Sequence, residues 1–135
     1  MTLSGTIAFA LVALLVNAAA GYAALRRRSV SGSGAVAGAL VGSVILIAGG
    51  FLYWIMLMLF FASSSAASRV GGREKRRLEQ MHERGSERDY VQVAANAGIA
   101  TLAVLLLRTT GDARFGVAAA AAFASVNADT WSSEL

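Results

Sequence analysis

The chain has 135 residues, of which 56% are hydrophobic and only 15% are charged, and its mean hydropathy is +0.60. Soluble domains carry about 25% charged residues, so this composition excludes an ordinary water-soluble domain and indicates a protein whose surface faces lipid. The lack of cysteine excludes disulfides, thiolate metal sites and a cysteine nucleophile, and the net charge of +4 comes from clustered cations without any nucleic-acid-binding signature.

The first charge-free stretch, residues 1–25, predicts a membrane-spanning helix over residues 4–25. A hydrocarbon core of about 30 Å requires about 20 helical residues. A cleaved signal peptide is the alternative, but signal peptides carry their positive charge before the apolar core. Here Arg26, Arg27 and Arg28 follow the apolar stretch, which favours a retained span with its N-terminus outside.

The second charge-free stretch, residues 29–68, is too long for one crossing. Forty helical residues would reach about 60 Å at about 1.5 Å each, which is about twice the hydrocarbon thickness. Because the chain has no proline, a break must come from glycine, and Gly49 and Gly50 form a pair near the middle of the stretch. We therefore predict a helical hairpin with arms at residues 34–48 and 51–67.

The rest of the chain adds one polar segment and two apolar ones. Residues 69–90 contain seven of the twelve arginines and lysines. Apolar stretches at residues 91–107 and 115–131 predict two further spans, joined by a short polar link at 108–114. The positive-inside rule then favours five crossings, because this topology places ten of the twelve cations on the cytoplasmic side.

The predicted fold class is therefore an all-α polytopic membrane protein, with about five transmembrane helices in a single integral membrane domain over residues 1–135. Its N-terminus is expected outside, and its loop at residues 69–90 and its C-terminus are expected in the cytoplasm. In a prokaryote this membrane would be the plasma membrane.

Three glycines in the second predicted span, Gly34, Gly38 and Gly42, form two overlapping G-x-x-x-G repeats. Small residues at this spacing let the backbones of neighbouring helices approach closely. We therefore predict that these glycines serve helix contacts.

Polar residues within or beside apolar spans are costly and are candidates for function. Asn127 and Asp129 lie at the end of the last apolar stretch, and Glu134 follows them. Oxygen donors of this kind suit Mg²⁺, which usually takes one or two carboxylates and fills its other positions with phosphates and water. A helix cap and a solvated terminus explain the same residues equally well.

Two further polar sites lie in or beside predicted spans. Asn96 lies one to two turns inside the fourth span, where its amide could bind a ligand or, more simply, bridge to another helix. Ser31 and Ser33 open the second span, where backbone N–H groups could face a phosphate. A flexible linker is the simpler explanation for these serines, since the lysine and spacing of a P-loop are lacking.

The polar loop at residues 69–90 could bind nucleotide phosphates or anionic lipid head groups. Lys75 is the single lysine of the chain. Charges of both signs at helical spacing, such as Lys75 and Glu79, also suit a plain solvated helix. His82 is the chain's single histidine, so no zinc site is assigned.

Four segments of distinctive sequence follow one another along the chain. They are Ser-Gly-Ser-Gly-Ala at 31–35, Phe-Phe-Ala-Ser-Ser-Ser at 60–65, Val-Gln-Val-Ala-Ala-Asn-Ala-Gly at 91–98 and Asn-Ala-Asp-Thr-Trp-Ser-Ser-Glu at 127–134. Together they resemble the DUF92 family of membrane proteins, and the last segment is the most specific. The family includes plant phytyl-phosphate kinase and the vertebrate protein called transmembrane protein nineteen, so the resemblance implies a CTP-dependent kinase that converts an isoprenoid monophosphate to its diphosphate.

The resemblance also implies roles for individual residues. Phosphoryl transfer requires neutralisation of charge and positioning of the nucleophile. Asp129 and Glu134 would hold Mg²⁺ and, together with Lys75 beside the triphosphate, form the catalytic set. The residues that would bind the substrate or the nucleotide are Ser31, Ser33, Asn96 and Asn127.

Family members are longer than this chain, so we expect it to correspond to their N-terminal half and to be incomplete at its C-terminus. Its expected protein partner is the missing C-terminal half or a second copy of this chain. The other expected partners are the lipid bilayer, the isoprenoid monophosphate and CTP. No binding to nucleic acid is expected. A non-enzymatic or truncated membrane protein is the alternative. A small transporter with Asp129 as its coupling site is a weaker one.

Overall fold

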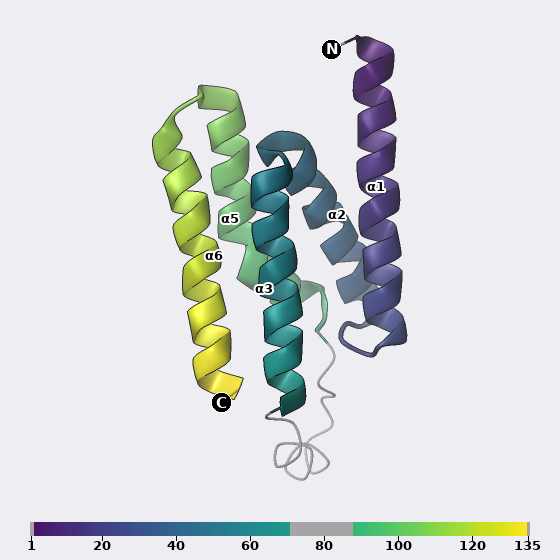
Figure 1. Cartoon of the computed structure of the whole chain (residues 1–135), viewed down its shortest axis with the longest axis vertical. Helices are drawn as coiled ribbons and strands as arrows, with labels where there is room; N and C mark the ends of the chain where they lie inside the picture. The colour runs from purple at the N-terminus through teal and green to yellow at the C-terminus, as the bar shows by residue number, and fades with distance from the viewer. Residues whose placement is uncertain (1, 71–87, 135) are drawn as a thin grey trace.

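The computed structural model describes residues 2–70 and 88–134, and this part of the chain forms a bundle of α-helices (Figure 1). The described residues include no β-strand, and one isolated parallel bridge joins Val30 to Arg88. The helices are α1 (Leu3–Arg26), α2 (Gly32–Gly49), α3 (Phe51–Val70), α5 (Tyr90–Thr110) and α6 (Ala113–Glu134).

Local sequence signals set several helix ends. α1, α2 and α5 begin after Thr2, Ser31 and Asp89, whose side-chain oxygens each accept a hydrogen bond from a backbone N–H in the first turn. Such N-caps satisfy donors that the first turn of a helix leaves unpaired. α5 ends at Thr110 and is capped by Gly111, whose φ of 70° is the left-handed conformation that glycine supplies at helix C-termini.

A hairpin turn divides the long charge-free stretch, as the sequence predicts. α2 ends at Gly49, Gly50 caps it, and α3 begins at Phe51. The two helices run in opposite directions (Figure 1). Gly50 has a φ of 83° and a ψ of −174°, a conformation that is essentially restricted to glycine. The turn therefore depends on Gly50 in particular.

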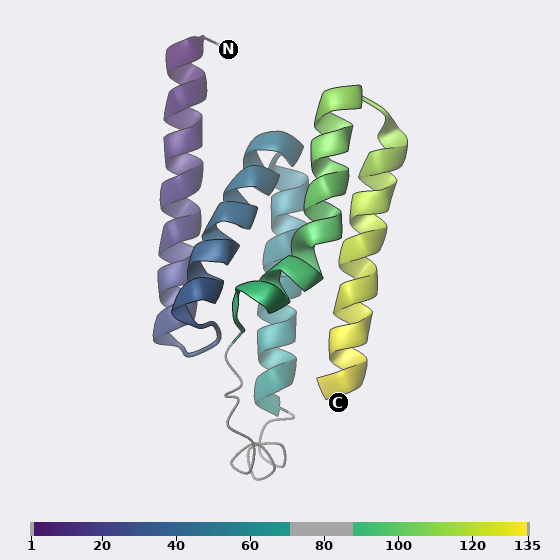
Figure 2. The ribbon, with the colours of Figure 1, turned by 180° about the vertical axis from the view of Figure 1, so that it is seen from behind.

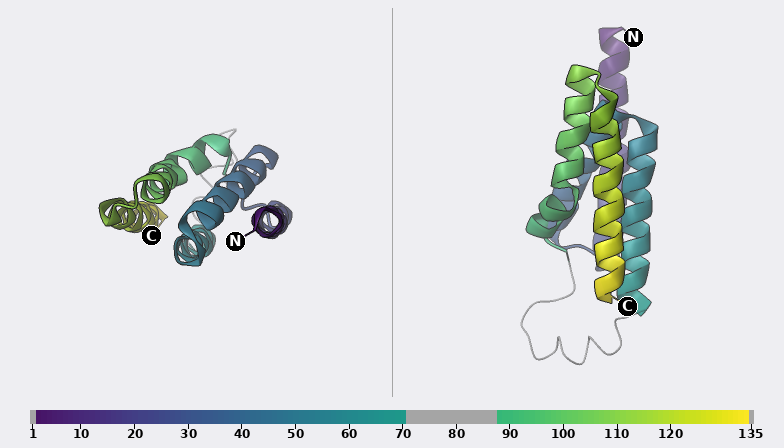
Figure 3. Two further views of the ribbon diagram at one scale, coloured as in Figure 1. Left: turned by 90° about the horizontal axis from the view of Figure 1, so that it is seen from above. Right: turned by 90° about the vertical axis from the view of Figure 1, so that its left-hand side faces the viewer.

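α2 lies at the centre of the bundle. It contacts α1, α3 and α5, whereas α6 contacts α3 and α5. α1 stands at one edge, beside α2, in the views from behind (Figure 2) and from above (Figure 3). The N-terminus and the C-terminus lie at opposite ends of the bundle (Figure 1).

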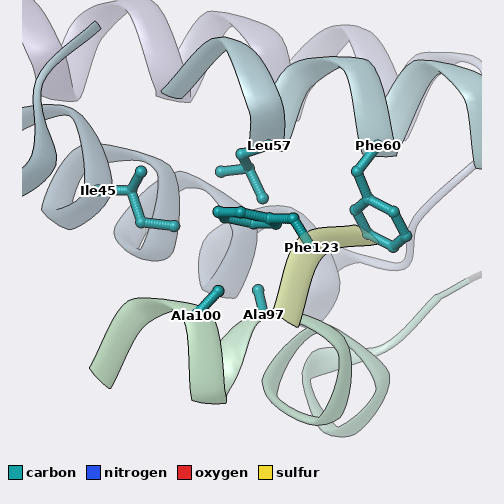
Figure 4. Packing of buried hydrophobic residues seen from close by; sticks show 6 residues of the cluster. All are labelled: Ile45, Leu57, Phe60, Ala97, Ala100 and Phe123. Atoms are coloured by element: carbon teal, nitrogen blue, oxygen red, sulfur yellow. The ribbon is translucent and has the colours of Figure 1, made fainter. Parts of the chain in front are cut away.

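The main hydrophobic core joins α2, α3, α5 and α6, and α1 contributes no residue to it. Figure 4 shows the ring of Phe123 between Leu57 on one side and Ala97 and Ala100 on the other. The two small alanines leave space for the ring, and protein interiors are close-packed, so Phe123 anchors α6. The buried members of the cluster are Ile45, Leu57, Phe60, Ala97, Ala100 and Phe123.

The outer surface of the bundle suits a bilayer. Large apolar side chains remain exposed along α1, among them Leu3, Leu11 and Leu15. α1, α2, α3 and α5 are each long and apolar enough to cross a membrane. α6 has 22 residues, but its many alanines and its polar last turns leave it less apolar than these four. The prediction of a polytopic all-α membrane protein is confirmed, with four described helices that meet both conditions.

Asn17 links α1 to α3 through a side-chain hydrogen bond. It is only 2% exposed, its Nδ2 donates to the Ala13 carbonyl oxygen at 2.8 Å, and its Oδ1 accepts a hydrogen bond from Trp54 Nε1 at 3.0 Å. A polar group among membrane-spanning helices needs such internal partners, because lipid supplies none. Gly42 of α2 lies so close that a Cβ there would overlap Asn17 Oδ1.

A second close approach joins the loop between α1 and α2 to the start of α5. The Arg88 N–H donates to the Ser29 carbonyl oxygen at 3.2 Å, and the Ser31 N–H donates to the Arg88 carbonyl oxygen at 2.9 Å. A Cβ at Gly34 would overlap that same Arg88 carbonyl oxygen. Glycine at position 34 therefore allows the two backbones to pair.

We predict that Gly42→Ala lowers the melting temperature of the protein in detergent. Alanine favours a helix over glycine by about 1 kcal/mol, but its methyl group must displace Asn17 from Trp54. Overpacking and an unpaired buried polar group each cost about 1–3 kcal/mol. Gly98→Ala is the matched control, because a Cβ at Gly98 meets nothing within 4 Å. Equal melting temperatures for the two variants would contradict the close contact.

We also predict that Gly34→Ala loosens the loop that pairs with Arg88. The added methyl group meets a backbone atom, so no side-chain rotation can relieve the overlap. The Ser31 amide should then exchange its hydrogen with solvent faster than in the unmodified chain, because exchange reports local opening. Gly32→Ala serves as the control, since a Cβ at Gly32 has open space. Unchanged exchange in Gly34→Ala would rule out the pairing.

Candidate functional site

Several of the candidate residues gather at one end of the bundle. The start of α2, the end of α3, the start of α5 and the end of α6 all lie toward the end that holds the C-terminus (Figure 1). These helix ends carry Ser31, Ser33, Asn127 and Asp129. Lys75 lies outside the described residues, and its predicted role stays a prediction.

The hydroxyls of Ser31 and Ser33 are engaged by the chain itself. Ser31 Oγ accepts a hydrogen bond from the Gly34 N–H at 3.2 Å and donates to the Arg88 carbonyl oxygen at 3.3 Å. Ser33 Oγ accepts from the Tyr90 N–H at 3.4 Å. The two serines thus cap α2 and hold the start of α5, so the segment is a structured joint. A direct contact of these hydroxyls with phosphate stays a prediction.

Arg88 is the cation that the fold places most firmly at this end. Its Nη1 donates to Ser64 Oγ at 3.0 Å, and its guanidinium lies 5.7 Å from the centre of the Phe61 ring. A cation over an aromatic face is attracted by the ring. Ser64 is fully buried and in turn donates to the Phe61 carbonyl oxygen at 3.2 Å. These contacts fix the direction of the Arg88 side chain.

A pocket of about 90 Å³ lies among α1, α2, α3 and α5 beside Arg88. Its walls on α1 and α2 consist mostly of glycine and alanine, and its wall on α3 consists of larger apolar side chains. Three of its lining residues carry polar side chains. They are Asn17, Arg88 and Asn96.

The three α2 glycines that were predicted to serve helix contacts divide into two groups. Gly34 and Gly42 make close contacts, with Arg88 and Asn17 respectively. Gly38 lines the pocket, and a Cβ built on it meets nothing within 4 Å. The prediction of helix contacts therefore applies to two of the glycines, whereas the third leaves a space open.

Asn96 differs from the other asparagines of the bundle. Asn17 and Asn127 both accept hydrogen bonds from other helices. Asn96 is half-buried, lines the pocket and has no hydrogen-bond partner within the described part of the chain. The bridge to another helix, which was the simpler explanation, is therefore not made by the described residues.

Asn127 positions the last turns of α6. Its Oδ1 accepts a hydrogen bond from Ser63 Oγ of α3 at 2.9 Å, and Ser63 precedes Ser64, the partner of Arg88. Asp129 follows two residues later and is exposed. The polar ends of α3 and α6 are thus joined beside Arg88.

The predicted pairing of Asp129 with Glu134 on one metal ion meets a geometric difficulty. α6 remains helical to Glu134, and positions five residues apart in an α-helix differ by about 140° around its axis. The described residues contain no group of three His, Asp or Glu side chains that could hold a metal. Asp129 offers carboxylate oxygens at this end, and the shared metal site stays a prediction.

Sequence reasoning missed Arg88, Ser63 and Ser64 as individual site residues. Arg88 is one of seven cations in a polar segment. It differs from the others in its described contacts with residues that are distant in sequence, which the sequence alone does not reveal. The serines offered a signal, because three consecutive hydroxyls at the end of an apolar span are costly without partners.

The opposite end of the bundle carries a different polar feature. Arg114 Nη2 lies 2.6 Å from Asp112 Oδ2 in the turn between α5 and α6. The hydrogen bonds from Arg114 lower the pKa of the Asp112 carboxyl from its ordinary value. Because the Arg114 side chain is 89% exposed, this pair adds little stability, and Asp112 serves below as a control remote from the site.

Comparisons with known proteins give the family. Residues 2–135 match the family described as Integral membrane protein DUF92. Protein PGR of Arabidopsis thaliana is 34% identical over 137 residues, which cover 91% of this chain and 47% of that protein. The chain thus spans about half the length of this relative. No solved structure matches the chain. The chain belongs to the DUF92 family of integral membrane proteins.

Proposed function

We propose that this chain forms the N-terminal part of a membrane-bound kinase that transfers a phosphoryl group from CTP to an isoprenoid monophosphate at the cytoplasmic face. The observation that carries the proposal is the hydrogen bond between Ser63 and Asn127. It holds the end of α6, with the carboxylate of Asp129, at the same end of the bundle as the guanidinium of Arg88. A cation and a carboxylate at one membrane face suit chemistry on phosphates.

The charges and amides suit this reaction class. Phosphoryl transfer depends on positioning and on neutralising the oxygens of the transferred group. Arg88 would neutralise a phosphate, since guanidinium and phosphate form strong paired hydrogen bonds. Asn127, already fixed through Ser63, would orient the nucleotide or its phosphates.

Magnesium would add charge neutralisation for the triphosphate of CTP. Asp129 fits as one ligand, because Mg²⁺ is commonly bound by one or two carboxylates together with substrate phosphates and water.

The proposal predicts phosphorylation of phytyl monophosphate by membranes that contain this chain, when CTP and Mg²⁺ are supplied. The diphosphate product is measured by mass spectrometry. Asp129→Asn should lower the rate on the order of 100-fold, as the loss of one group that stabilises transition-state charge commonly does. Asp112→Asn, at the opposite end of the bundle, should leave the rate unchanged.

The longer plant relative is the positive control for this assay, because this chain corresponds to about half of it. If neither protein forms diphosphate from phytyl monophosphate, the proposed reaction is wrong. Equal rates for Asp129→Asn and Asp112→Asn would remove Asp129 from the site.

A further inference from the structure

We infer that the pocket beside Arg88 is the binding site for the acceptor lipid, with the monophosphate held by Arg88 and Asn96 and the first part of a single isoprenoid chain held among α1, α2 and α3. The inference rests on the proposed function for the identity of the lipid. Binding in the pocket is nevertheless a property that can be measured without any phosphoryl transfer.

The pocket has the two-part chemistry of a single-chain lipid phosphate. Its walls are almost entirely apolar, and two of the residues that line it, Arg88 and Asn96, carry a guanidinium and an amide. The contacts of Arg88 with Ser64 and Phe61 hold the guanidinium in place before a ligand arrives. Asn96 lacks a hydrogen-bond partner among the described residues, so a phosphate oxygen would supply the acceptor that its N–H groups lack.

The size of the pocket limits what it can take. A cavity of about 150 Å³ is enough for one benzene molecule, so the present pocket of about 90 Å³ admits only a few carbon atoms. The remainder of a long chain must leave the pocket. Ala20 of α1 lines it and is exposed, so the chain would pass into the bilayer beside α1. A lipid with two acyl chains joined near its head group does not suit this narrow space.

The missing side chain at Gly38 keeps the pocket open. Gly34 and Gly42, on the same helix, are occupied by contacts with other parts of the chain, whereas a Cβ on Gly38 finds empty space. A larger side chain at this position would therefore fill the pocket without striking the backbone. Leucine also favours a helix more than glycine does, so the variant should fold.

The test measures binding of radiolabelled phytyl monophosphate to the purified chain in phosphatidylcholine nanodiscs. We expect Gly38→Leu to abolish saturable binding. Gly98→Leu makes the same chemical change on α5 at a site with open space that does not line the pocket, and it should bind normally. Melting temperatures of both variants verify that each one is folded. Normal binding by a folded Gly38→Leu protein would overturn the inference.

The head-group contact is tested separately. Arg88→Gln should weaken binding about tenfold or more, because hydrogen bonds to charged groups contribute about that factor. Arg108→Gln removes one cation near the opposite end of α5 and should leave binding unchanged. Equal weakening by both substitutions would mean that net charge alone attracts the lipid, which would overturn the assignment of Arg88.

Competing ligands identify what the pocket recognises. Unlabelled phytyl monophosphate should displace the label, whereas phytol, inorganic phosphate and vesicles of phosphatidic acid should not at equal concentration. Displacement by phosphatidic acid would show a general anionic-lipid site and overturn the single-chain assignment. Saturable binding by this chain, with no diphosphate product from either this chain or the longer plant relative, would refute the proposed kinase reaction and keep the pocket. Turnover by Gly38→Leu at the normal rate would refute the pocket and keep the reaction.

Discussion

Two backbone hydrogen bonds join the loop between α1 and α2 to Arg88, and the arrangement of the polar end of the bundle depends on them. They bring the start of α5 against the start of α2, across 57 positions of sequence. Arg88 then reaches Ser64 of α3 and lines the pocket. In the apolar surroundings of a membrane protein, unpaired backbone groups are costly, so this pairing fixes the loop and the guanidinium together.

The three glycines on one face of α2 have two different roles. Gly34 admits the Arg88 backbone, and Gly42 admits Asn17, which in turn accepts a hydrogen bond from Trp54. Both glycines permit contacts that hold the bundle together. Gly38, between them, borders the pocket and leaves room for a ligand. Stability and binding are thus assigned to neighbouring turns of the same helix.

Much of the architecture could be predicted from the sequence, because charge, length and glycine placement act locally. The hairpin followed from a stretch too long for one crossing, and Gly50 adopts the positive φ that the turn needs. The role of Arg88 could not be predicted, since the partners described above lie in the α1–α2 loop and in α3, both distant in sequence. The different environments of Gly34 and Gly38, four residues apart, likewise depend on what each helix neighbour presents. The predicted pairing of Asp129 and Glu134 left open whether α6 continued as a helix, which decides their relative directions.

The pairing between the α1–α2 loop and the start of α5 is tested most directly by chemical cross-linking. The chain has no cysteine, so Ser33→Cys and Tyr90→Cys can be introduced together and treated in membranes with a short bifunctional thiol reagent. Ser33 Oγ lies 3.4 Å from the Tyr90 backbone nitrogen, and both residues are exposed. We expect efficient cross-linking of this pair and none between Ser33→Cys and Arg108→Cys. No cross-link at positions 33 and 90, or equal yields for the two pairs, would contradict the pairing.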